Sequence, residues 1–153
     1  FSGKAGWKND RWETTLNYTR ITAHGRYLMP REWGRDPFFT FLPRERNEGL
    51  GDVHAVMGKI NYKIPLLRLT ASAAFGHYSL PDVTNFALNK YGLPSYNQFN
   101  VDARYKFAGI LKGLETQLLF VYKNKTGNSY NNDKYVINKV DMSVWNMVIN
   151  YQF

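Results

Sequence analysis

Apolar and polar residues alternate along most of the chain, and a period of two is typical of β-strands whose two faces meet different surroundings. The clearest stretches are KINYKI, LLRLTASAAFGHY, QFNVDARYKF, LETQLLFVYK and MSVWNMVINYQF. In QFNVDARYKF, for example, Phe99, Val101 and Tyr105 alternate with Asn100 and Arg104. The pattern predicts six strands, near residues 11–22, 52–64, 66–78, 98–108, 113–124 and 139–153.

The connections between these strands alternate between short and long. Two residues separate Ile64 from Leu67, and AGILKG separates Phe107 from Leu114. The other three connections are long and polar, over residues 23–51, 79–97 and 125–138. Because neighbouring antiparallel strands reverse direction, the short turns should gather at one end of the sheet and the long loops at the other. Outer-membrane β-barrels are built in this way, with the long loops on the extracellular side.

The length of the strands fits the same class of protein. At roughly 3.3 Å per residue and a tilt near 40°, an apolar span of about eight residues rises about 20 Å, close to the apolar band of such barrels. No segment approaches the roughly 18–20 apolar residues of a spanning helix. A soluble sandwich or a lipocalin-like barrel also alternates, but neither needs its loop lengths to segregate by end.

The two ends of the chain suggest a larger barrel. Alternating apolar residues run through Ile149 and Tyr151 to Phe153, which resembles the C-terminal assembly signal of bacterial outer-membrane proteins. FSGKAGW reads like the turn FAGILKGL, so Phe1 is expected to end an earlier strand. Six strands are too few to close a barrel. We therefore expect an all-β, transmembrane antiparallel β-barrel, of which residues 1–153 form about six C-terminal strands out of roughly 16–18.

Composition narrows the possible functions only a little. The 153 residues include no cysteine, which excludes disulfides and thiolate metal sites. The formal charge of +8 fits nucleic acid, an acidic surface or an anionic solute, and charge alone does not choose among them.

Two stretches carry a family resemblance. YKFAGILKGLETQLLFVYKNK and REWGRDPFFTFLPRERNEG resemble the closing portion of the OprD-type outer-membrane porins, in which a strand, a "KGL" turn and a strand precede the last long loop. The resemblance implies a monomeric barrel of about eighteen strands. It also implies a narrow, basic-lined pore for small, often carboxylate-bearing solutes, constricted in part by an inward-folded loop over residues 23–50.

Basic side chains on the non-apolar parity are the first candidates for a pore lining. In a barrel they would face the lumen, where a basic wall attracts anions. The alternative is that they merely solvate a water-filled lumen. These residues are Lys59, Lys63, Arg68, Arg104 and Lys106.

The loop REWGRDPFFTFLPRERNEG supplies four more candidates. Arg31, Arg35, Arg44 and Arg46 surround an aromatic cluster at residues 38–41. Such a loop could pack into the pore and present guanidinium groups to a carboxylate. We expect the inward packing; the alternative is a loop that stays outside and contacts lipopolysaccharide or water. Arginines among aromatics also occur in single-stranded nucleic-acid binding, but no nucleic-acid motif accompanies them.

Catalysis and metal binding find little support. His24, His54 and His77 are scattered without metal-type spacing, and no nucleophile elbow is present. We expect no enzyme, cofactor or metal site. We expect a porin of the bacterial outer membrane that passes small hydrophilic solutes, with membrane lipids, lipopolysaccharide and the remaining strands as partners. The alternative is a non-conducting barrel that serves as a scaffold in an envelope complex, with lipoproteins among its partners.

Overall fold

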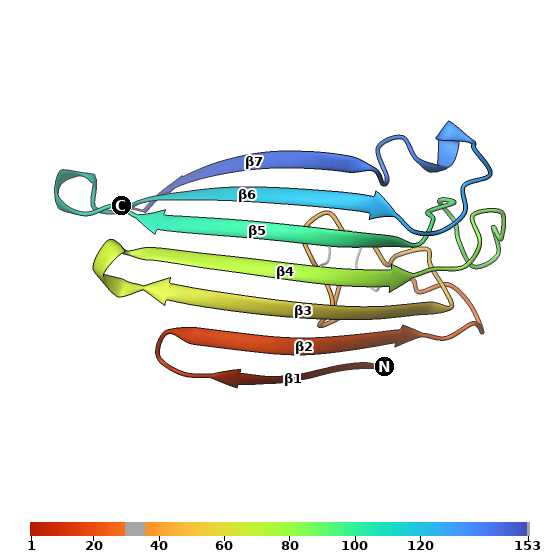
Figure 1. The fold of residues 1–153 in the computed structure, drawn as a ribbon, viewed down its shortest axis with the longest axis horizontal. Helices are drawn as coiled ribbons and strands as arrows, with labels where there is room; N and C mark the ends of the chain where they lie inside the picture. The colour runs from red at the N-terminus through yellow and green to blue at the C-terminus, as the bar shows by residue number, and fades with distance from the viewer. Residues whose placement is uncertain (30–35, 153) are drawn as a thin grey trace.

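The computed structural model describes residues 1–29 and 36–152, and this part of the chain is all-β. Seven antiparallel strands form one open sheet in sequence order (Figure 1). They are β1 (Ser2–Lys8), β2 (Trp12–Ile21), β3 (Val53–Ile64), β4 (Leu69–Ser79), β5 (Tyr96–Lys106), β6 (Leu114–Lys125) and β7 (Met142–Tyr151). The short 3-10 turns are η1 (Pro65–Leu67), η2 (Gly109–Leu111) and η3 (Asp133–Tyr135). The prediction of an all-β, antiparallel chain is confirmed.

Each of the six predicted segments overlaps one strand, but β1 was not among the predicted strands. Ser2–Lys8 is a strand along its whole length, not the turn that follows an earlier strand. Its two glycines made it read as a turn. Instead, the turn lies at residues 9–11, where the Asn9 side-chain oxygen accepts hydrogen bonds from the Arg11 and Trp12 amides at 2.9 and 2.7 Å.

The turns and loops segregate by length, as the spacing predicts. The short connections, residues 9–11, 65–68 and 107–113, lie at one end of the sheet (Figure 1). The long connections, residues 22–52, 80–95 and 126–141, lie at the other end. No helix in the described ranges is long and apolar enough to cross a membrane.

The strands give the sheet an apolar and a polar face. Residues paired across antiparallel strands share a face, so the register carries each face through all seven strands. On the apolar face every strand exposes a large hydrophobic side chain: Trp7, Leu16, Ile60, Phe75, Phe99, Leu118 and Trp145. The polar face includes Thr19, Lys59, Gln98, Arg104 and Lys123.

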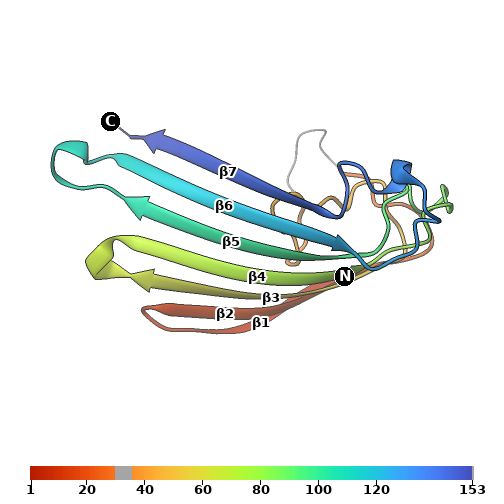
Figure 2. The same ribbon diagram turned by 45° about the horizontal axis from the view of Figure 1, so that its top comes forward.

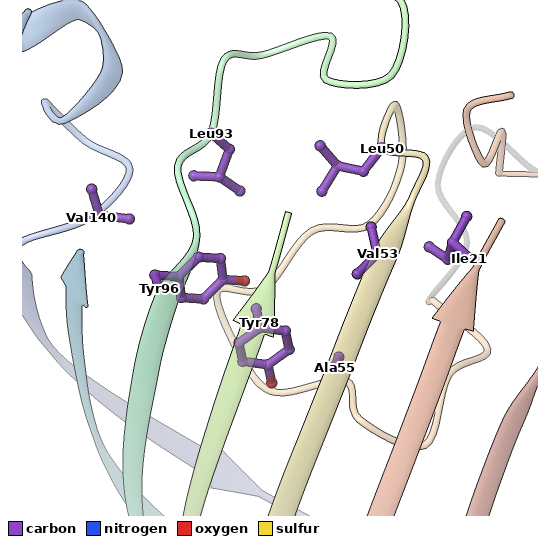
Figure 3. Packing of buried hydrophobic residues seen from close by; sticks show 8 residues of the cluster. All are labelled: Ile21, Leu50, Val53, Ala55, Tyr78, Leu93, Tyr96 and Val140. Atoms are coloured by element: carbon purple, nitrogen blue, oxygen red, sulfur yellow. The ribbon is translucent and has the colours of Figure 1, made fainter. Parts of the chain in front are cut away.

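The buried core lies on the polar face, near the long loops. Ile21, Val53, Ala55, Tyr78 and Tyr96 project from polar-face positions of their strands (Figure 3). The rings of Tyr78 and Tyr96 stack with centroids 4.7 Å apart. The loops complete the cluster with Leu50, Leu93 and Val140. The buried side chains of this cluster therefore lie under the loops, while the large side chains of the apolar face stay exposed.

Candidate functional site

Residues 36–51, which we call the covering loop, lie against the polar face of the sheet. Figure 2 shows the segment beside the sheet near its long-loop end. Leu42 packs with Met57 of β3 and Ala74 of β4 in a small buried cluster. The ring of Phe38 packs edge-on against Tyr27 at 4.9 Å, next to the main core. Apolar contacts thus fix the loop at two places.

Side chains of five strands also bind the covering loop by hydrogen bonds. From β1, the Ser2 hydroxyl oxygen accepts from the Phe39 amide at 3.0 Å. The Tyr78 hydroxyl donates to the Thr40 carbonyl at 2.8 Å, and the Gln98 amide donates to the Pro43 carbonyl at 2.7 Å. The Thr40 hydroxyl donates to the Thr19 hydroxyl oxygen at 2.9 Å, and the Lys123 ammonium donates to the Arg44 carbonyl. Because most of these bonds reach loop carbonyls, they hold the loop's backbone in place rather than its particular side chains.

A basic pocket of about 210 Å³ opens where the covering loop meets the other long loops. Its lining combines four cationic residues with an apolar and amide wall: Arg44, Arg46, Lys123 and Lys139, with Leu50, Tyr91, Leu93 and Asn138. Such a lining suits a small anion with an apolar part.

Two of the four cations are held in place by Tyr91. The Arg46 guanidinium lies over the Tyr91 ring, 4.9 Å from its centroid. The Lys139 ammonium donates to the Tyr91 carbonyl at 2.8 Å and to the Lys134 carbonyl at 2.7 Å. Partial burial, and then the charge of Lys134, lower the pKa of Lys139. Both cations are therefore positioned before any ligand arrives.

A smaller pocket, of about 90 Å³, lies under the tip of the covering loop. Leu42 and Pro43 form its loop side, and Lys59 and Arg104 are among the residues of its sheet side. The guanidinium of Arg104 forms an ion pair with Asp102 at 3.0 Å, which offsets part of its charge.

The other predicted candidates are spread over the sheet. Lys63 and Lys106 lie on the polar face near the short turns, and Lys106 pairs with Glu115 at 3.7 Å. Arg68 lies in the turn that follows η1, with φ of 51°, and not within a strand. Arg31 and Arg35 lie outside the described residues.

Two lysines of the basic pocket, Lys123 and Lys139, are not among the residues that the sequence predicted. Lys123 could have been found, since it continues the polar parity of Glu115 and Gln117 along β6. Lys139 could not, because it lies in a loop whose approach to Tyr91 depends on the tertiary fold.

A hollow of about 730 Å³ on the apolar face is larger than either basic pocket. It lies around Gly58, where an added methyl group would meet nothing within 4 Å, and Trp7, Leu16, Phe75 and Phe99 are among its lining. Polar groups that could orient a solute are scarce there, so we place the candidate site on the other face.

No group of three or more His, Cys, Asp or Glu side chains in the described ranges could hold a metal ion. Comparisons with protein-family models, curated proteins and solved structures found no match for this chain.

Proposed function

We propose that this chain forms part of the wall of a bacterial outer-membrane β-barrel of the OprD porin type, through which small hydrophilic, anionic solutes diffuse. One observation carries the proposal. The chain's own loop covers the polar face, while large apolar side chains stay exposed on all seven strands of the other face. A sheet in water would be covered on its apolar face, because that burial drives folding. The reversed arrangement fits a sheet with lipid outside and water inside.

The aromatic residues at the short-turn end support the membrane assignment. Trp12 and Tyr62 stack there at 4.1 Å, and the rings of Tyr105 and Phe107 meet at 4.8 Å. Aromatic girdles at the edges of the apolar band are typical of outer-membrane barrels.

The open edges indicate how such a barrel would close. Unpaired edge groups are costly in lipid, so β1 and β7 both need partners. With seven strands, β1 and β7 run in the same direction. Copies of this sheet inserted in one orientation would therefore bring parallel edges together. An all-antiparallel barrel requires an odd number of strands from elsewhere.

The basic pockets support a preference for anions. Arg44, Arg46, Lys123 and Lys139 line one pocket, and Lys59 and Arg104 line the other, on the face that would border the pore. A pore wall whose charges have one sign raises the local concentration of oppositely charged solutes.

Planar-bilayer recording of the full-length protein tests this function. We expect conductance with an anion-selective reversal potential in a salt gradient. Replacing Arg46 and Lys139 with Gln should lower the anion-to-cation permeability ratio, on the order of twofold per charge removed. The matched control is Lys112→Gln, an exposed cation in the short turn after η2. A cation-selective wild-type channel would contradict the role of the basic residues.

One observation favours a second candidate, a non-conducting barrel that acts as a scaffold. The covering loop lies on the polar face at the long-loop end of the sheet, as a plug would. Purified protein that inserts into bilayers, never conducts and copurifies with envelope lipoproteins would support the scaffold.

A further inference from the structure

A single carboxylate fastens the covering loop both to itself and to the sheet. One oxygen of Glu45 accepts hydrogen bonds from the Leu42 amide at 2.7 Å and from the Tyr78 hydroxyl at 3.0 Å. The other oxygen accepts from the Asn47 side-chain amide at 2.7 Å. Since Tyr78 belongs to β4, the position of the loop depends on the state of this buried group.

A second carboxylate shares the network. One oxygen of Asp36, also buried, accepts from the Asn47 backbone and side-chain amides at 3.0 and 3.1 Å. One amide group thus bridges Asp36 and Glu45. None of the ion pairs among the described residues includes either carboxylate. The negative charge of Asp36 so close by favours the protonated form of Glu45.

The surrounding groups supply little neutralising charge. Those that interact with Glu45 are Asp36 from the loop, Tyr78 from β4, Tyr96 from β5 and Lys123 from β6. Lys123 is the one cation among them, and its charge interacts with that of Glu45. The two groups form no ion pair, because the Lys123 ammonium donates to the Arg44 carbonyl and lies over the Tyr96 ring at 4.6 Å.

Burial, with Asp36 adding to it, raises the pKa of Glu45 from 4.5 to about 7, against the lowering effect of its hydrogen bonds to Asn47, Leu42 and Tyr78. In a released loop the carboxyl would meet water and regain its ordinary pKa. The closed loop therefore holds the proton more tightly than the open loop does.

From this geometry we infer that residues 36–51 form a proton-controlled cover of the polar face, held closed when Glu45 is protonated and released when Glu45 is ionised. The closed state is fully favoured below pH 4.5 and loses this advantage as the pH rises to about 7. The ratio of open to closed loop should rise about tenfold per pH unit between roughly pH 5 and 7, and level off above about 7. Release would uncover Gln98 and Lys123, which the closed loop now contacts.

Distance measurement between two spin labels tests the cover. These 153 residues contain no cysteine, so Phe39→Cys on the loop and Asn150→Cys on the polar face of β7 give a labelled pair in a full-length protein whose other cysteines, where there are any, have been replaced by serine. Pulsed electron paramagnetic resonance should show one distance population at pH 5, and a second population that grows through pH 6 to pH 7 and then stays nearly constant at pH 8. Glu45→Gln should abolish the pH dependence. Glu48→Gln should retain it, because Glu48 lies at the surface in contact with the Tyr91 hydroxyl.

Distances that do not change between pH 5 and 8, or a Glu45→Gln protein that still responds to pH, would overturn the cover. The measurement needs no conductance, so it stands apart from the proposed pore. A conducting protein with a pH-independent loop would contradict only the cover. A pH-dependent loop in a non-conducting protein would contradict only the pore.

Discussion

At the scale of single residues, side chains of the polar face hold the covering loop by hydrogen bonds to its backbone carbonyls. Tyr78, Gln98 and Lys123 each project from a different strand and bind Thr40, Pro43 and Arg44. The Thr40 carbonyl is bound in a buried position, where a polar group without a partner is costly. The sheet therefore holds the loop at residues 40, 43 and 44.

Tyr78→Phe should loosen the covering loop. The change removes a hydroxyl that serves both Thr40 and Glu45, which should cost about 1–3 kcal/mol of local stability. Hydrogen exchange of the amides at residues 40–47 should quicken accordingly. Tyr91→Phe is the control, since it removes a hydrogen bond to Glu48 nearer the surface and should leave these amides almost unchanged. Equal exchange in wild type and Tyr78→Phe would show that the hydroxyl does not hold the loop.

At this scale the sequence predicts on which face of the sheet a side chain lies better than it predicts which residues that side chain contacts. Alternation alone assigns Lys59, Lys63 and Arg104 to one face, and the register agrees. It misassigns Arg68, because Pro65 starts a 3-10 turn that delays β4 until Leu69. The buried position of Glu45 has no local signal, since it depends on Tyr78, 33 residues away.

At the scale of elements, strands with clean alternation were predictable and β1 was not. SGKAGWK offers few apolar residues and two glycines, so propensity favours a turn. Pairing with β2 overrides that preference. At Gly6, β1 and β2 lie so close together that a Cβ atom on residue 6 would lie 2.4 Å from the Thr14 carbonyl oxygen.

Gly6→Ala should therefore disrupt the β1–β2 pairing, at a cost of about 1–3 kcal/mol. Gly58→Ala is the matched control, because its added methyl group would point into open space on the apolar face. Hydrogen exchange of the β1 amides should quicken in the first variant and stay near wild type in the second. If both variants exchange alike, the close approach at Gly6 is not what fixes β1.

At the scale of the whole molecule, the loops cover the polar face of the sheet and leave the apolar face exposed, the reverse of what is usual for a sheet in water. The long loops bury the polar face around Tyr78 and Tyr96, and the apolar face carries exposed side chains such as Trp145 at 66%. The alternation predicted both faces but not which of them the loops would cover. Alternation within a strand separates the two faces but does not determine which of them the loops pack against.

The proposed membrane barrel is tested most directly by measuring whether each face of the sheet meets lipid or water in a bilayer. Single cysteines at residues 101–104 of β5 alternate between the apolar face (Val101, Ala103) and the polar face (Asp102, Arg104). Spin labels on the full-length protein in liposomes can be relaxed by oxygen, which is soluble in lipid, or by a water-soluble nickel complex. We predict a period of two, with oxygen dominant at Val101 and Ala103 and nickel at Asp102 and Arg104. Nickel access that is equal at all four positions would show that both faces meet water, and would contradict the membrane wall.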